Sequence, residues 1–132
     1  MKHDFQTVAT ATAGVCAGLA LIWLCAPDLL LALWGVAYSY PAGLVGRRGA
    51  ALFAGIAVML WQARQAVPSP ARSAMAQGMI VGCVLLAVSG AVELCTGHAG
   101  PGILIAVAAE GAIAAAFLAI EIHARQRQSA AS

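Results

Sequence analysis

Four long apolar stretches, separated by short polar or proline-rich segments, occupy most of the chain. They cover residues 8–26, 49–67, 74–96 and 101–123. Each stretch is close to the roughly 20 residues that an α-helix needs to cross a hydrocarbon layer about 30 Å thick. The pattern therefore predicts an all-α, polytopic membrane protein. We expect four transmembrane helices in an up-down bundle, forming a single membrane domain over residues 1–132.

A shorter apolar segment, residues 29–40, lies between the first two stretches. It follows Pro27 and Asp28, where one helix can stop and the next can be capped. Three aromatic residues gather toward its end: Trp34, Tyr38 and Tyr40. Because such rings favour the headgroup level of a membrane, we expect a short interfacial or re-entrant helix here. The alternative is a fifth span over residues 29–45, which would place the two termini on opposite sides.

The composition supports a membrane location. Apolar residues make up 62% of the 132-residue chain and charged residues 9%, whereas a typical soluble domain has about 25% charged residues. So little charge could not cover a water-soluble fold. The net charge of +2 and the absence of a basic run give no reason to expect a nucleic-acid partner. The lipid bilayer is the partner that the composition indicates.

The basic residues indicate an orientation, because segments rich in Lys and Arg tend to stay in the cytoplasm. With both termini in the cytoplasm, the outer segments contain only Arg47 and Arg48. The remaining basic residues then lie on the cytoplasmic side: Lys2, Arg64, Arg72, Arg125 and Arg127. The first apolar stretch is longer than the core of about 7–15 residues found in cleavable signals, so we expect it to be a permanent span.

Every span carries small residues at four-residue spacing. The longest ladder is Ala74, Gly78 and Gly82 in the third span; the others are Gly14 with Gly18, Ala51 with Gly55, and Gly111 with Ala115 and Ala119. Since lipid tails are as apolar as Leu, membrane helices associate by close packing through such small residues rather than by burial alone. The pattern fits a compact four-helix bundle, a homo-oligomer or a membrane-protein partner equally well.

Glu110 is an acidic residue near the middle of the fourth stretch. Counted from Pro101 at 1.5 Å per residue, it lies about 13–14 Å deep, close to the bilayer centre. An ionisable residue there costs about 2.5–3.5 kcal/mol on insertion scales, so we expect it to face the bundle or a cavity. Two interpretations stay open. Glu110 is a proton relay, ion or polar-ligand site, or it is a neutral carboxyl that hydrogen-bonds a neighbouring helix.

A second group of charges lies at the outer membrane level. Glu93 is near the end of the third span, and Arg47 and Arg48 precede the second span. Because a positive charge at a helix N-terminus opposes the helix dipole, these arginines need an anion nearby. We expect Glu93 to contact Arg47 or Arg48 in a structural clamp. Glu121 and Arg125, four residues apart, are expected to form a surface pair.

The four cysteines fall at two depths. Cys25 and Cys95 lie near the outer ends of their spans, where an oxidising compartment would permit a disulfide between them. Cys16 and Cys83 lie at mid-depth, and no C-x-x-C motif is present. The alternative is four plain apolar thiols. None of the histidines lies deep in a span, so we expect no metal and no cofactor.

Several stretches resemble a family of small bacterial inner-membrane proteins. They are the run from Pro27 to Val36, then Arg48-Gly49-Ala50 opening a span that closes with Trp61-Gln62-Ala63-Arg64, and Ser89-Gly90 late in the third span. The chain is similar over most of its length to the four-helix proteins grouped as DoxX-like. The resemblance implies a four-helix bundle in a bacterial inner membrane and no settled activity, so it transfers no catalytic residue.

Three functional hypotheses follow. The first is a non-enzymatic accessory, interaction or structural component of the membrane. The second is a small oligomeric, proton-coupled transporter with Glu110 as the titrating site. The third is a membrane enzyme that acts on a lipid or a quinone, using Glu93 with Arg47 or Arg48; the sequence leaves enzymatic activity open and names no catalytic residue.

Overall fold

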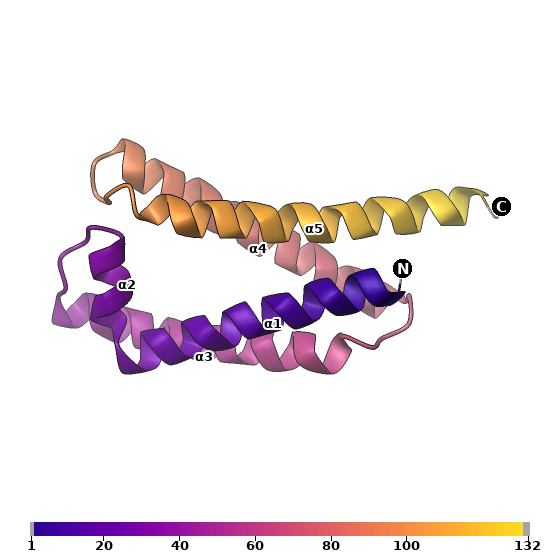
Figure 1. The fold of residues 1–132 in the computed structure, drawn as a ribbon, viewed down its shortest axis with the longest axis horizontal. Coiled ribbons are helices and arrows are strands. Elements are labelled where there is room, and N and C mark those ends of the chain that lie inside the picture. The colour runs from indigo at the N-terminus through magenta and orange to yellow at the C-terminus, as the bar shows by residue number, and fades with distance from the viewer. Residues whose placement is uncertain (1, 131–132) are drawn as a thin grey trace.

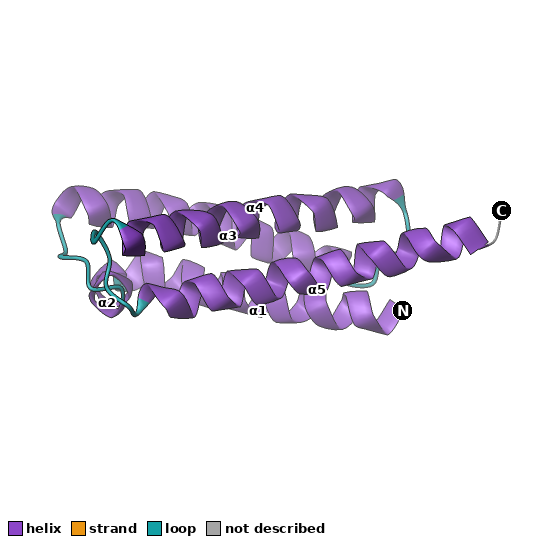
Figure 2. Ribbon diagram, turned by 90° about the horizontal axis from the view of Figure 1, so that it is seen from above, coloured by secondary structure: helices purple, strands orange, loops and turns teal. Residues whose placement is uncertain are grey.

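The computed structural model describes residues 2–130, which form helices joined by short loops (Figures 1 and 2). The helices are α1 (Lys2–Cys25), α2 (Pro27–Leu33), α3 (Tyr40–Ala63), α4 (Pro70–Cys95) and α5 (Ile103–Ala130). All except α2 are long and apolar enough to cross a membrane. The predicted all-α fold with four candidate spans and a short extra helix is therefore confirmed. A fifth span over residues 29–45 is wrong, because α2 has only 7 residues and reaches only about 10 Å.

The second span begins earlier than its hydropathy indicates. Helix α3 starts at Tyr40, not near residue 49. The Ser39 hydroxyl caps it by accepting a hydrogen bond from the Ala42 N–H at 3.3 Å, and Pro41 suits the first turn, where its missing N–H costs nothing. Arg47 and Arg48 therefore lie about two turns inside the helix, and the argument that placed them at its N-terminus is corrected.

The four long helices form two antiparallel pairs. Helix α1 packs along α3, and α4 packs along α5. Both termini and the loop between α3 and α4 lie at one end of the molecule, which we call the terminal end (Figure 1). Helix α2 and the loop between α4 and α5 lie at the opposite end, which we call the α2 end. This arrangement is the expected up-down topology, with the two termini on one side.

The buried core joins the two pairs near the terminal end. The rings of Phe5 on α1 and Phe117 on α5 meet edge to face, with centroids 6.2 Å apart. Both rings are almost completely buried, as is Leu60 on α3. Small residues complete the core and let the backbones approach: Ala9, Ala13, Ala76 and Ala114. Edge-to-face rings add attraction beyond simple packing, so this end holds α1, α4 and α5 together.

At the α2 end, short backbone contacts add to a smaller set of buried apolar side chains, Leu30, Leu31 and Ile103. The Gly100 N–H donates a hydrogen bond of 2.6 Å to the Trp34 carbonyl, which ties α2 to the loop between α4 and α5. A Cβ at Gly102 would overlap the Leu33 carbonyl oxygen, so only glycine permits this approach. The Trp34 ring also packs edge to face on Trp23 of α1, at 5.5 Å. Helix α2 thus bridges the two helix pairs.

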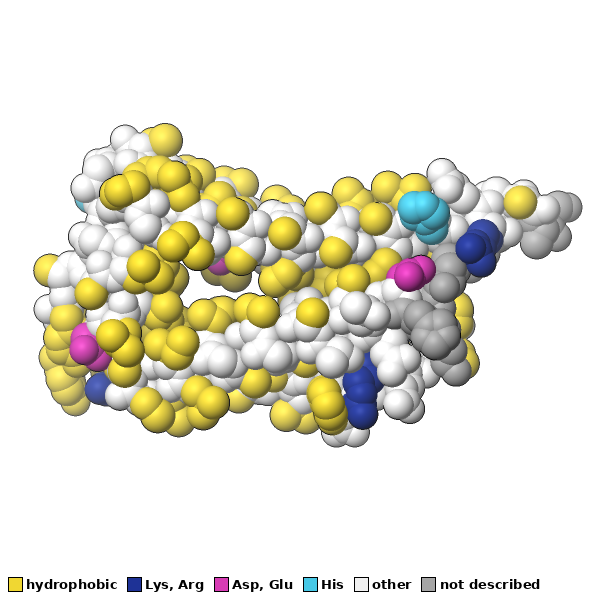
Figure 3. Space-filling view, viewed as in Figure 1, with side chains coloured by type: hydrophobic (Ala, Val, Ile, Leu, Met, Phe, Trp, Pro, Cys, Tyr) yellow, Lys and Arg dark blue, Asp and Glu magenta, His cyan; other side chains and the backbone are white. Residues whose placement is uncertain are grey.

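Between these two ends the helix pairs are loosely joined. The space-filling view shows a hollow between them near the α2 end, lined mainly by hydrophobic side chains, with an acidic side chain visible inside it (Figure 3). Many mid-span glycines also face open space, since a Cβ added to them would meet nothing within 4 Å: Gly14, Gly18, Gly55, Gly78, Gly82 and Gly111. The small-residue ladders are thus largely unused by contacts within the chain.

Candidate functional site

Three chemically active side chains lie within electrostatic range of one another inside the bundle, and we call them the mid-span cluster. Glu110 lies about two turns into α5 and is half-buried. Cys83 on α4 lies within electrostatic range of both Glu110 and Cys16 of α1. The two thiols are buried, at 5% exposure for Cys16 and 6% for Cys83. The cluster therefore comprises one carboxyl and two thiols on three different helices.

The geometry of the cluster limits what it can do. Both cysteines are free thiols. Among residues 2–130 no group of three or more His, Cys, Asp or Glu side chains is arranged to hold a metal ion. Glu110 is the acid of the cluster, and its half-exposed position gives it access to whatever fills the space beside α5. The arrangement is suited to proton exchange or to contact with a polar ligand.

The predicted contact between Glu93 and an arginine is not formed among the described residues. Instead Glu93 pairs with His98, with 3.0 Å between Oε2 and Nδ1, and both side chains are more than half exposed. The same nitrogen lies 3.1 Å from the Thr96 hydroxyl. Arg47 and Arg48 lie exposed on α3, which makes at most marginal contact with α4. The physical reason is the pairing of the helices: α4 packs on α5, so the arginine-bearing helix is not its neighbour.

The disulfide that the sequence left open is absent from the structure. Cys25 and Cys95 are free thiols and both are exposed. They end α1 and α4, which belong to different helix pairs. Both cysteines do end their helices at the α2 end, as the sequence predicts, but a shared end does not place two side chains beside each other.

A polar cluster at the terminal end was not expected from the sequence; it comprises Ser73, Gln77 and Glu121. Glu121 is only 7% exposed and accepts a hydrogen bond from the half-buried Ser73 hydroxyl, while the amide of the exposed Gln77 lies 3.4 Å from the same hydroxyl. The surface pair expected between Glu121 and Arg125 is therefore wrong. The signal that could have indicated the cluster is Ser73 and Gln77, two polar residues one helical turn apart at the start of the third apolar stretch.

Arg72, which precedes Ser73 on α4, is a buried cation at the same end. It is 4% exposed, and its guanidinium lies 4.2 Å from the centroid of the Phe5 ring. It also donates a hydrogen bond of 3.3 Å to the Ala66 carbonyl. No buried side-chain nitrogen or oxygen in the described residues lacks a hydrogen-bond partner. A fully satisfied cluster of this kind favours a structural role in clamping α4 to α1 and α5.

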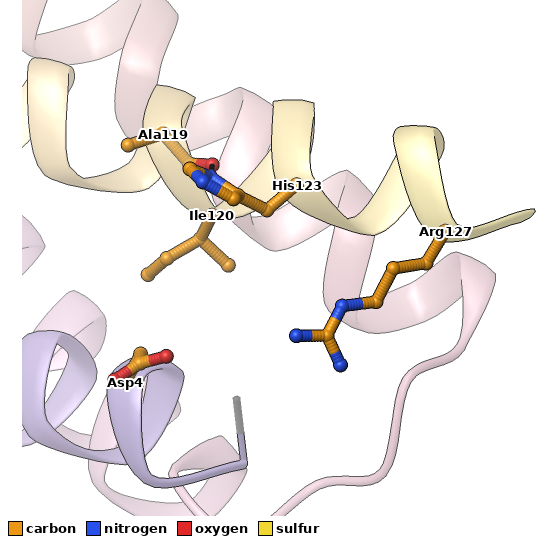
Figure 4. A pocket seen from close by; sticks show the side chains of 5 residues that line it. All are labelled: Asp4, Ala119, Ile120, His123 and Arg127. Atoms are coloured by element: carbon orange, nitrogen blue, oxygen red, sulfur yellow. Dashed lines mark hydrogen bonds between the residues drawn. The ribbon is translucent and has the colours of Figure 1, made fainter.

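A small pocket of about 230 Å³ opens next to this cluster, between the start of α1 and the end of α5 (Figure 4). Asp4 comes from α1, while Ile120, His123 and Arg127 come from α5. The His123 Nδ1 donates a hydrogen bond of 2.6 Å to the Ala119 carbonyl, which fixes the ring against its own helix. The pocket is shallow and carries both signs of charge.

Comparison with known proteins adds no assignment to this geometry. No family model, no curated protein and no solved structure matches the chain.

Proposed function

We propose that this chain is an accessory or interaction component of a membrane, which associates with another membrane helix through one face of α4. We call this face the α4 ladder and define it by Ala74, Gly78 and Gly82. A second copy of the chain is the simplest partner, because a symmetric dimer needs no other component. The proposal gives the chain a role in assembly rather than in chemistry.

The observation that carries the proposal is the exposure of the whole ladder. Ala74, Gly78 and Gly82 are all exposed, and a Cβ added to either glycine would meet nothing within 4 Å. The opposite face of α4, with Ala76, Met79 and Cys83, is buried against the rest of the chain. Only 11% of the apolar window of α4 is buried, less than in any other candidate span. The best-formed ladder thus lies on the helix with the largest uncovered surface.

A face of this kind can drive the association of two helices in a membrane. Small residues at four-residue spacing allow two helix backbones to approach closely, and the resulting van der Waals contacts and weak Cα–H···O bonds drive association in lipid. Larger side chains flank the ladder and would form the walls of the contact, among them Val81, 58% exposed, and Leu85, 65% exposed.

The test measures self-association in bilayers by energy transfer between chains that carry donor and acceptor labels. Gly78→Ile and Gly82→Ile are expected to reduce transfer severalfold, because a branched side chain holds the backbones apart. Gly111→Ile is the matched control, since Gly111 is equally open but lies on α5. Transfer that is unchanged in all variants, or reduced equally by the control, would contradict a role for α4. Association that needs a different membrane protein would appear as transfer only after that protein is added.

A carrier function is the second candidate, and the mid-span cluster is the observation that favours it. Glu110 is half-buried about two turns into α5, within electrostatic range of Cys83, and a hollow opens between the helix pairs (Figure 3). Proton uptake into proteoliposomes under an imposed potential tests it. A carrier loses this flux in Glu110→Gln and keeps it in Glu93→Gln, which alters an exposed carboxylate at the α2 end. Equal flux in all three proteins would end this candidate.

We also propose a bacterial inner-membrane location with the terminal end in the cytoplasm. Its support is the distribution of basic residues, since Arg64, Arg72 and Arg125 belong to the terminal end while Arg47 and Arg48 lie toward the α2 end. The enzyme hypothesis depended on a polar site formed by Glu93 with Arg47 or Arg48. Glu93 pairs with His98 instead, so we do not pursue it.

A further inference from the structure

A groove of about 840 Å³ runs between α1 and α3 near the terminal end. Helix α1 contributes Thr10, Ala13, Gly14 and Ala17. Helix α3 contributes Ala57, Val58, Trp61 and Gln62, and Arg64 follows as its C-cap residue. Its volume lies within the range of about 300–1,000 Å³ that is usual for small-molecule sites. On either helix the lining covers about seven residue steps, or roughly 10 Å, which is about a third of the hydrocarbon thickness.

The groove is polar at one end and apolar at the other. Because α1 and α3 are antiparallel, Thr10, Gln62 and Arg64 are the lining residues nearest the terminal end. Deeper in the membrane the lining becomes small and apolar, with Gly14, Ala17 and Ala57. Gly14 leaves open space, since a Cβ there would meet nothing within 4 Å. This order of polar and apolar groups is that of a phospholipid, headgroup first and acyl chain below.

Arg64 is held in place at the polar end. Its guanidinium stacks on Trp61, with Cζ 3.8 Å from the ring centroid, and one of its nitrogens donates a hydrogen bond to the Trp61 carbonyl. A guanidinium has five N–H donors, so this bond leaves most of them for another acceptor. Among residues 2–130 no carboxylate forms an ion pair with Arg64, and the groove lining contains no acidic residue. The groove therefore presents one fixed positive charge and no negative one.

From this charge and shape we infer that the groove binds an anionic phospholipid from the leaflet at the terminal end. The phosphate lies on Arg64 and Gln62, and one acyl chain lies over Gly14 and Ala17. A lipid with a net negative headgroup is preferred over a zwitterionic one, because the lining offers no carboxylate to an ammonium group. The inference is independent of the α4 ladder, which lies on another helix.

The first experiment is native mass spectrometry of the full chain, purified in detergent and supplied with phosphatidylglycerol or phosphatidylcholine. We expect the wild type to retain one molecule of phosphatidylglycerol in preference to phosphatidylcholine. Arg64→Gln should lower that retention about fivefold, as expected for the loss of one interfacial arginine. The matched control is Arg48→Gln, which removes the same charge from an exposed position toward the other end of α3. Equal retention of the two lipids, or equal losses in both variants, would overturn the inference.

The second variant tests the apolar half of the groove. Gly14→Leu places a side chain in the open space above Gly14 and is expected to reduce retention of phosphatidylglycerol without unfolding the chain. Gly111→Leu introduces the same side chain at an open position on α5, outside both the groove and the α4 ladder, and should leave retention unchanged. Retention that survives Gly14→Leu would show that the acyl chain does not occupy this groove.

A third measurement separates lipid from a second copy of the chain as the occupant. Trp61 becomes the only tryptophan in the double variant Trp23→Phe, Trp34→Phe. Brominated phosphatidylglycerol should quench its fluorescence at a lower mole fraction than brominated phosphatidylcholine, and Arg64→Gln should remove that difference. If another chain covered the groove, neither lipid would quench Trp61 efficiently, and the lipid site would be rejected.

Discussion

The guanidinium of Arg72 lies 4.2 Å from the ring centroid of Phe5, which joins a buried cation of α4 to an aromatic residue of α1. The two residues are 4% and 1% exposed. The same Phe5 ring also packs edge to face against the ring of Phe117 on α5. One ring therefore links α1, α4 and α5 at the terminal end, where the two helix pairs are held together.

Phe5→Leu should lower the free energy of unfolding by about 2.5–3.5 kcal/mol. The loss combines a desolvated cation–π contact, worth about 2 kcal/mol, with an aromatic pair, worth about 0.5–1.5 kcal/mol. Phe53→Leu is the matched control, because Phe53 is half-buried and has no ring or cation contact within the described residues. Denaturant titration in bicelles, followed by circular dichroism, measures both. Equal losses would mean that Phe5 contributes only its volume.

Ser73→Ala should lower the free energy of unfolding by about 1–3 kcal/mol, because it removes the hydrogen bond to the buried Glu121 carboxyl and leaves that acceptor unsatisfied. Ser89→Ala is expected to change it by less than about 0.5 kcal/mol. Ser89 is exposed and donates only to the Leu86 carbonyl of its own helix, at 2.9 Å. The same unfolding titration compares the two variants, and a loss for Ser89→Ala as large as that for Ser73→Ala would contradict the cluster.

Two glycine substitutions should have opposite signs. Gly102→Ala is expected to lower the free energy of unfolding by about 1–3 kcal/mol, because its methyl group would overlap the Leu33 carbonyl and push α2 away. Gly111→Ala is expected to raise it by up to about 1 kcal/mol, because this glycine lies in open space inside a helix and alanine is the better helix former. Thermal unfolding in detergent measures both. A neutral Gly102→Ala would show that α2 does not pack closely on the following loop.

Thiol labelling should distinguish the four cysteines and report the orientation. Cys25 and Cys95 are exposed whereas Cys16 and Cys83 are buried. A membrane-impermeant maleimide added to intact spheroplasts should label Cys25 and Cys95, because both end their helices at the α2 end. Cys25→Ser and Cys95→Ser should each remove half of the label, and the buried pair should react only after unfolding in detergent. Labelling that appears only after the cells are opened would reverse the orientation.

Hydropathy predicted the spans well because it depends only on local sequence. At the start of α3 two local signals compete: Arg47 and Arg48 favour a start near residue 49, whereas Pro41 favours a start near residue 41. The structure has the earlier start, because the Ser39 hydroxyl caps the helix and the helix continues past both arginines.

The pairing of helices could not be obtained in the same way. Glu93 was expected beside Arg48 because they share a membrane level, and Glu121 beside Arg125 because they share a helix face. In the structure Glu93 contacts His98 and Glu121 contacts Ser73. Which helix faces which depends on the packing of side chains far apart in the chain, such as Phe5 with Phe117. Hydropathy and residue spacing within one helix contain no information about which helix faces which.

The hydrogen bond from Gly100 to Trp34 bears on how the chain is assembled during synthesis. Helices α1 and α3 can complete their mutual packing as soon as the first hairpin leaves the ribosome. Helix α2 has to wait, since the N–H that binds the Trp34 carbonyl is synthesised only after the third span. The contact between Phe5 and Phe117 waits longer still, because Phe117 lies in the fourth span. Both connections between the helix pairs therefore depend on the second half of the chain.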